Sequence, residues 1–174
     1  MRIKSLLLVA AAIVTVLGFT IPEGQPEGVY SVQSKENRTD LHTRIAEPHT
    51  GPITKRAFYF LNFEPDDARI TCGHALNLDH TDTDAASADI DRQCGSGALI
   101  IGGYNFYAIR GTTVSFVCNR SWDNEYCDAR TRDQFDRVIT EYCGSYNAGW
   151  VTIPYTGITY GYDIASSEFC GTGT

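Results

Sequence analysis

The sequence predicts an α+β domain, a compact two-helix, antiparallel-sheet α/β sandwich with three disulfides. Three observations support this prediction. All six cysteines lie in the second half of the chain, and an even number of cysteines is typical of a disulfide framework. Two segments carry the end signals of helices, and both finish in Cys-Gly. Stretches rich in β-branched and aromatic residues follow each helical segment and indicate strands.

The expected order of elements is β-α-β-β-α-β-β. "FYFLNF" at 58–63 predicts the first strand, and "ARITC" at 68–72 is a further candidate. "TDTDAASADIDRQCG" predicts a helix, with Thr81 to Thr83 as N-cap candidates and Gly95 just past its end. "ALIIGG" and "FYAIRGTTVSFVCN" predict the strands that follow this helix.

The second half repeats this pattern. "CDARTRDQFDRVITEYCG" places apolar Phe135, Val138, Ile139 and Tyr142 at i, i+3, i+4 and i+7, which predicts a helix that ends at Gly144. "GWVTIP" and "GITYGYD" predict the last two strands. An antiparallel sheet with both helices on one face is the architecture that buries these elements best.

Three disulfides are expected from Cys72, Cys94, Cys118, Cys127, Cys143 and Cys170. Six cysteines permit fifteen pairings. We favour Cys118 with Cys127, because only the polar loop "NRSWDNEY" separates them, and we consider Cys72 with either Cys143 or Cys170. A zinc site is the competing use of cysteine, but no C-x-x-C pair supports it.

The N-terminus predicts a secretory signal peptide at residues 1–18. Arg2 and Lys4 precede the apolar run "SLLLVAAAIVTVLG", with small residues at the end. A membrane anchor is the alternative, but the run falls short of the ~20 residues that a span needs. The signal peptide and the disulfides predict a protein that is secreted into the culture medium or apoplast.

Residues 19–56 predict a disordered pro-segment. They contain four prolines, three glycines and no sustained period, and they end at the dibasic pair Lys55-Arg56. Secretory processing proteases of the kexin type cut after such pairs, which would leave residues 57–174 as the cysteine-rich domain. The alternative is that Lys55 and Arg56 are two ordinary surface charges.

The charge of residues 57–174 disfavours some partners. Seven arginines stand against sixteen acidic residues, which gives a net charge of −9, and there is no lysine. Nucleic acid and anionic membranes are therefore not expected as partners, because they bind clustered Lys and Arg. No cofactor motif occurs, so we expect no cofactor.

Two asparagines, Asn37 and Asn119, match the glycosylation pattern. "CGHALNLDHTDTD" holds His74 and His80 close to Asp79, Asp82 and Asp84, which could form a metal or acid-base site. The alternative is a loop that caps a helix, where Asp, Thr and Asn are common. The C-terminal aromatics, Tyr146, Trp150, Tyr155, Tyr160 and Tyr162, could form an interface or a carbohydrate platform, or could pack the sheet.

Several motifs carry a family resemblance between Ile70 and Cys170. "CG…DTDAASADIDRQCG", "VSFVCN", "VITEYCGSYNAGW" and "ITYGYD" resemble small secreted cysteine-rich proteins of filamentous fungi. More distantly they are similar to the killer-toxin-four group and to necrosis-inducing extracellular effectors, and this resemblance implies the same two-helix sandwich. The killer toxin acts on calcium channels through basic residues, so the acidic domain described above is not expected to share that activity.

We therefore expect a monomeric, secreted fungal effector or toxin-like protein that binds an extracellular host or competitor protein or glycan without catalysing a reaction. One alternative is a small secreted hydrolase, similar to a ribonuclease, that uses His74 or His80 with a carboxylate. Another is a carbohydrate-binding protein of the cell wall.

Overall fold

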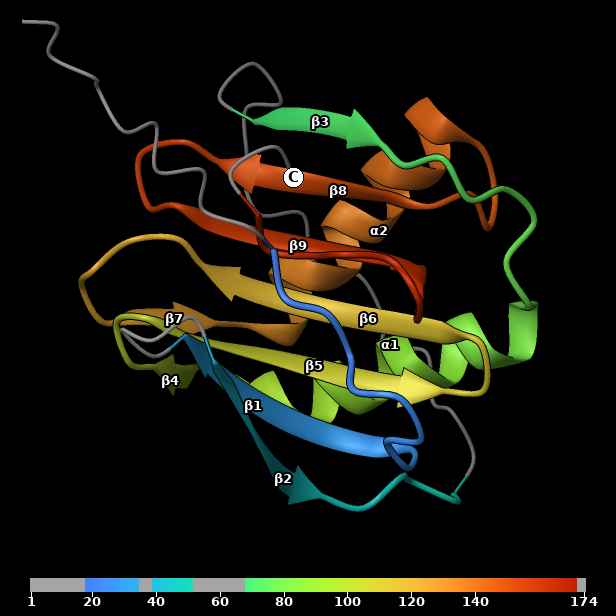
Figure 1. The fold of residues 1–174 in the computed structure, drawn as a ribbon. Helices are drawn as coiled ribbons and strands as arrows, with labels where there is room; N and C mark the ends of the chain where they lie inside the picture. The colour runs from blue at the N-terminus through green and yellow to red at the C-terminus, as the bar shows by residue number, and fades with distance from the viewer. Residues whose placement is uncertain (1–17, 35–38, 52–67, 172–174) are drawn as a thin grey trace, which may run out of the picture.

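The computed structural model describes residues 18–34, 39–51 and 68–171, and Figure 1 shows its layers. The elements follow one another as β1 (Gly28–Ser34), β2 (Asp40–Ala46), β3 (Arg69–Cys72), α1 (His80–Cys94), β4 (Ala98–Ile100), β5 (Tyr104–Arg110), β6 (Thr113–Asn119), β7 (Glu125–Cys127), α2 (Ala129–Cys143), β8 (Gly149–Ile153) and β9 (Ile158–Ile164). Seven strands form an antiparallel sheet in the order β2-β1-β5-β6-β9-β8-β3, and β4 and β7 form a second, two-stranded sheet. The predicted α+β sandwich with three disulfides is confirmed.

Both helices cover one face of the large sheet, as the view in Figure 1 shows. Ile90 of α1 and Phe135 and Ile139 of α2 are fully buried against sheet residues such as Val117 and Tyr160. The predicted apolar face of α2 is therefore confirmed at its centre, whereas Tyr142 is 63% exposed.

Both predicted helix stops are confirmed, because Gly95 and Gly144 follow the last helical residues with positive φ. The N-cap of α1 differs from the prediction. Asp79, not one of Thr81 to Thr83, accepts a hydrogen bond from the backbone N–H of Asp82 at 2.9 Å. Asp128 caps α2 in the same way.

A buried ion cluster joins the two helices. Arg132 of α2 is 4% exposed and donates to both carboxylate oxygens of Asp91 of α1, at 2.5 and 3.0 Å. It also donates to Asp136 at 2.8 Å. Burial raises the pKa of Asp136 to about 6, because the lost hydration of the carboxylate outweighs the attraction of Arg132. The other oxygen of Asp136, Oδ1, has no hydrogen-bond partner in the described part of the chain.

The opposite face of the sheet has its own aromatic core. Tyr107, Phe116, Trp150 and Phe169 are buried there. The segment before β1 crosses this face in Figure 1, and Phe19 exchanges two backbone hydrogen bonds with Phe169 at 2.7 and 3.1 Å. The chain therefore covers both faces of its sheet, one with helices and one with its two end segments.

The predicted disorder of residues 19–56 is wrong for residues 19–34 and 39–51. β1 pairs with β5 from Gly28↔Ile109 to Gln33↔Tyr104, and β2 pairs with β1. The partner of β1, strand β5, lies far along the chain, so composition and local periodicity did not reveal this strand. The folded domain therefore begins before residue 57.

The disulfides are Cys72–Cys143, Cys94–Cys127 and Cys118–Cys170. The favoured pairing of Cys118 with Cys127 is wrong. Successive side chains of a strand point to opposite faces, and Cys118 shares the aromatic face with Phe116, whereas Cys127 lies in the helix-side core. The pairing of Cys72 with Cys143, one of two alternatives, is confirmed.

Four predictions fall outside the described residues. These are the signal peptide up to residue 17, the strand at 58–63, the dibasic pair Lys55-Arg56 and the glycosylation site Asn37. They remain predictions from the sequence.

Candidate functional site: a tryptophan-bearing loop

The carboxylates of the candidate acid-base segment hold the loop and helix together. Asp79 caps α1, and Asp82 Oδ2 accepts a hydrogen bond from the backbone N–H of Thr112 at 2.9 Å. A hydrogen-bonded carboxylate at a helix N-terminus is the ordinary capping arrangement. The capping interpretation of this segment is therefore confirmed for Asp79, whereas Asp82 joins the start of α1 to the turn between β5 and β6.

The two histidines have different neighbours. His80 stacks on Tyr146 with ring centroids 3.7 Å apart, and the Tyr146 hydroxyl lies 3.4 Å from both oxygens of Asp84. Partial burial and then the charge of Asp84 raise the pKa of Tyr146. His74 instead attracts the carboxylate of Asp163. The pKa of Asp163 is nevertheless raised, because burial of the carboxylate outweighs this attraction and the hydrogen bonds that it accepts. In the described segments, no group of three or more His, Cys, Asp or Glu residues is arranged to hold a metal ion.

Asn119 has a structural role that conflicts with the predicted glycosylation. Its side chain is buried, and Nδ2 donates to the carbonyls of Ile100 at 3.2 Å and Asp123 at 2.8 Å. Its Oδ1 accepts from the N–H and the hydroxyl of Ser121 at 3.0 and 2.9 Å. A glycan on Nδ2 would displace these bonds, so the folded domain disfavours glycosylation at Asn119, which stays a prediction from the sequence.

These bonds shape the loop 120–124, and its ends are also attached to neighbouring turns. The N–H of Arg120 donates to the carbonyl of Gly157 in the β8–β9 turn at 3.0 Å. The N–H of Gly102 donates to Asn124 Oδ1 at 3.1 Å. A Cβ at Gly102 would lie 2.1 Å from the carbonyl oxygen of Trp122, so only glycine permits this close approach. The loop therefore has a fixed backbone.

Trp122 stands on this loop with 93% of its surface exposed. Beside the loop, Leu99 of β4 and Tyr126 of β7 are cross-strand partners and are 44% and 65% exposed. Ile101 follows β4 and is 54% exposed, whereas Ile100 is buried in the helix-side core. We call Leu99, Ile101, Trp122 and Tyr126 the tryptophan-loop surface. Exposed apolar groups gathered in this way are typical of interaction sites.

Trp122 was not among the candidate residues predicted from the sequence, although a signal was present. "NRSWDNEY" is polar apart from its aromatic residues, and it lies between Cys118 and Cys127. A tryptophan in such a loop has no apolar neighbours in sequence with which to form a core. The disulfide Cys94–Cys127 attaches β7 to the end of α1, so this part of the surface is held rigidly.

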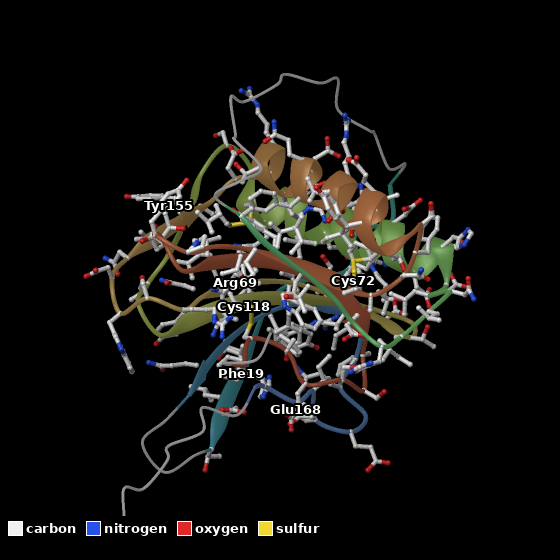
Figure 2. All side chains as sticks on the ribbon, turned by 90° about the horizontal axis from the view of Figure 1, so that it is seen from above. Phe19, Arg69, Cys72, Cys118, Tyr155 and Glu168 are labelled. Atoms are coloured by element: carbon white, nitrogen blue, oxygen red, sulfur yellow. A yellow bond between two sulfur atoms is a disulfide. The ribbon has the colours of Figure 1, made fainter. Side chains whose placement is uncertain are left out.

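The C-terminal aromatics mostly pack the sheet. Trp150, Tyr160 and Tyr162 are buried, which confirms the packing interpretation for these three. Tyr155 is 72% exposed at the end of the β8–β9 turn and extends away from the sheet in Figure 2. The Tyr155 side chain is therefore available to a ligand. Tyr155 lies on the same turn that contacts Arg120.

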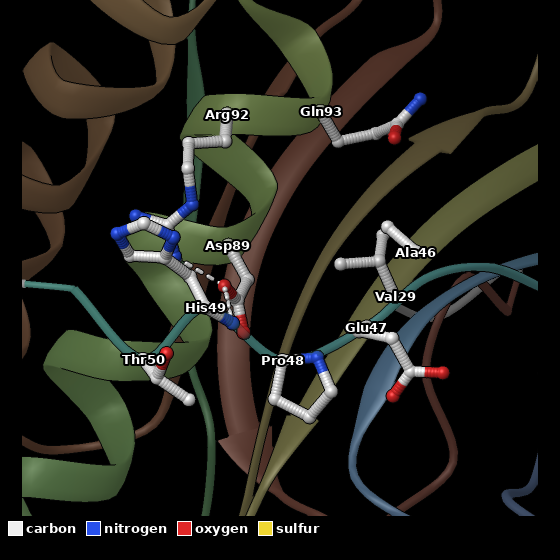
Figure 3. A pocket seen from close by; sticks show the side chains of 9 residues that line it. All are labelled: Val29, Ala46, Glu47, Pro48, His49, Thr50, Asp89, Arg92 and Gln93. Atoms are coloured by element: carbon white, nitrogen blue, oxygen red, sulfur yellow. Dashed lines mark hydrogen bonds and ion pairs between the residues drawn. The ribbon is translucent and has the colours of Figure 1, made fainter.

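A shallow hollow of about 400 Å³ lies between α1 and the segment that follows β2 (Figure 3). Asp89 at its base is 2% exposed and forms ion pairs with Arg92 and, at 2.6 Å, with Arg110. The backbone N–H of His49 also donates to Asp89, at 3.2 Å. Because several donors satisfy this carboxylate, the hollow is better explained as a contact between two chain segments than as a reactive site.

Comparison of the chain with protein-family models, with curated proteins and with solved structures gave no match. In the described part of the chain, neither helix is long and apolar enough to cross a membrane.

Proposed function

We propose that this protein is a secreted fungal effector or toxin-like protein that binds an extracellular host or competitor target through the tryptophan-loop surface, without catalysing a reaction. The observation that supports this most is Trp122, which is 93% exposed on a loop whose backbone is held by buried hydrogen bonds. Tryptophan is the residue type most enriched among those that dominate binding energy at interfaces.

Two further features support a binding role. The loop already has a fixed backbone, so little conformational entropy is lost when a partner binds. Leu99 and Tyr126 extend the apolar area beside Trp122 on a disulfide-anchored sheet. Three disulfides are compatible with an extracellular location.

The experiment compares the retention of the secreted protein on isolated leaf cell walls and on living hyphae of an unrelated fungus. Trp122→Ala is expected to weaken retention at least about tenfold, because a tryptophan that dominates an interface typically contributes about 2 kcal/mol or more and about 1.4 kcal/mol corresponds to a factor of ten. Tyr142→Ala is the matched control, since Tyr142 is 63% exposed on α2 and lies outside the surface. Both variants should unfold at the temperature of the wild type.

The proposal is wrong if the wild type is retained on neither material. It is also wrong if Trp122→Ala binds as well as the wild type. In that case the apolar surface of β4 and β7 has no part in recognition.

A carbohydrate-binding wall protein is a second candidate, because Trp122 and Tyr155 are both exposed on adjoining loops. Aromatic rings at a surface are suited to stacking against sugar rings. Competition with soluble chitin and glucan oligosaccharides distinguishes the two, because they displace a glycan binder and leave a protein binder in place.

The hydrolase alternative has less support. His80 stacks on Tyr146, and the carboxylate on which His74 acts is Asp163, outside the predicted segment. Asp79 and Asp82 already accept backbone hydrogen bonds. Replacing both histidines with alanine should therefore leave retention unchanged. A loss of hydrolysis of RNA by this double variant would support the hydrolase instead.

A further inference from the structure

We propose that the N-terminal segment, residues 18–34 and 39–51, is a permanent noncovalent subunit of the folded protein. Cleavage after Arg56 would then produce a two-chain protein and would not release a pro-segment. The cut is hydrolysis by an external protease, which breaks one peptide bond and adds one water molecule. The proposal depends on the contacts of the described segment, and it holds whichever target the protein binds.

The backbone of the segment completes the large sheet. β1 pairs with β5 over six residues, from Gly28↔Ile109 to Gln33↔Tyr104. Without β1, strand β5 would become an edge of the sheet. The N–H and C=O groups on that side of β5 would then lose their partners. An uncovered strand edge of this length also promotes aggregation. Loss of the segment is therefore unfavourable for the backbone alone.

The side chains of the segment are buried on both faces of the sheet. Val29, 2% exposed, belongs to the helix-side core. Tyr30 and Val32, 4% and 0% exposed, belong to the aromatic core on the other face. Tyr30 stacks on Tyr107 with ring centroids 5.2 Å apart, and Phe19 packs near Phe169. Dissociation would expose all of these apolar surfaces to water.

The segment also satisfies buried polar groups. The hydroxyl of Tyr107, a residue with no exposed surface, is hydrogen-bonded by Gln25 at 2.9 Å and by His42 at 2.7 Å. Gln25 and His42 both belong to the segment: Gln25 precedes β1 in the sequence, and His42 follows it. If the segment left, a tyrosine in the centre of the sheet would lose both of these partners.

A second polar contact lies at the hollow in Figure 3. Arg110 on β5 donates to the carbonyl of His49 at 2.7 Å and to Asp89 at 2.6 Å. Glu27 accepts from the N–H of Gly111 at 2.9 Å and lies 3.7 Å from Arg110. Glu27, just before β1, and His49, after β2, are therefore held by the same arginine.

No disulfide holds the segment, because the three bridges all lie between Cys72 and Cys170. The chain has no cysteine before Cys72. The association after cleavage would therefore be noncovalent, so the dissociation of the two fragments can be measured.

The experiment cuts the purified full-length secreted protein with a kexin-type protease at Lys55-Arg56, the only adjacent basic pair in the chain. If that bond resists, a recognition sequence for a specific protease replaces residues 53–58. The cut protein is then analysed by size-exclusion chromatography and intact mass. We expect one peak at the elution volume of the uncut protein, with two fragment masses that add up to the uncut mass plus one water.

Two further measurements show that the association is noncovalent. In concentrated guanidinium chloride without reductant, the two fragments should separate. The unfolding midpoint of the cut protein should fall when the protein is diluted tenfold, because dissociation is concentration-dependent, whereas that of the uncut protein should not change.

Variants locate the contact. Tyr30→Ser with Val32→Ser should cause the fragments to separate in native buffer after cleavage. The matched control, Leu41→Ser with Ile45→Ser, changes residues of β2 that are 44% and 40% exposed and should leave the single peak intact. The proposal is overturned if the C-terminal fragment of the cut wild-type protein elutes alone in native buffer. It is also overturned if the unfolding midpoint of the cut wild-type protein does not depend on protein concentration.

Discussion

Replacing Asn119 with alanine tests whether this buried amide shapes the tryptophan-bearing loop. Its side chain makes four hydrogen bonds, two as donor to carbonyls and two as acceptor from Ser121. Each bond contributes about 0.5 to 1.5 kcal/mol net. The exposed loop groups regain water in the variant, so we expect a loss of about 2 to 4 kcal/mol in the free energy of unfolding.

The assay is equilibrium unfolding in guanidinium chloride with the disulfides intact. A second readout is the fluorescence anisotropy of Trp122, measured with Trp150→Phe in every variant so that one tryptophan reports. Asn119→Ala should lower this anisotropy, because the loop loses its fixed backbone. Ser121→Thr is the control: it keeps the hydroxyl and the glycosylation pattern and should change neither readout.

The reasoning would be refuted by an Asn119→Ala protein within about 0.5 kcal/mol of the wild type and with unchanged anisotropy. Such a result lies in the range of ordinary surface substitutions. Intact mass supplies an independent check. A glycan on Asn119 in the folded, secreted protein would show that its amide is free, contrary to the four hydrogen bonds.

Two further predictions concern stability. Val32→Ala removes two methyl groups from a fully buried side chain and should destabilise the uncut protein by about 2 to 3 kcal/mol. The control, Leu41→Ala, changes an exposed side chain and should cost less than about 1 kcal/mol. Denaturant unfolding measures both. Asp136 has a pKa of about 6 in the folded state against 3.8 in the unfolded state, so the native state binds more protons in this range. The free energy of unfolding should therefore fall by at most about 3 kcal/mol as the pH rises from 4 to 6. Asp136→Asn should flatten this slope. Asp133→Asn, which alters an exposed pair with Arg137 and removes only the smallest of the effects on the pKa of Asp136, should change the slope far less. Equal destabilisation by Val32→Ala and Leu41→Ala, or an unaltered slope in Asp136→Asn, would contradict these predictions.

Local signals predicted the helices well. The C-terminal ends of α1 and α2 follow from Cys-Gly pairs, which act within a few residues of where they stand. Strands β4, β5, β6, β8 and β9 follow from runs of β-branched and aromatic residues, whereas β7 lies in a segment that was predicted as a polar loop. These features are local, so one sequence is enough to predict them.

The candidate site was harder to predict because its parts come from separate segments. Asn119 resembles a glycosylation acceptor in sequence, and only its contacts with Ile100 and Asp123 show that it is buried. The histidine segment looked reactive, but its carboxylates bind Thr112 and the start of α1. Whether a polar side chain is free or bonded depends on distant partners.

The sequence by itself therefore determined the fold class, the helix ends and the presence of six cysteines that can form bridges. The tertiary structure decided which cysteines pair, because Cys118 on β6 points into the aromatic core and Cys127 on β7 lies in the helix-side core. It also decided that the N-terminal segment belongs to the domain. The physical reason is the same in both cases: pairing across a sheet joins residues far apart in the chain, and composition records only what is near.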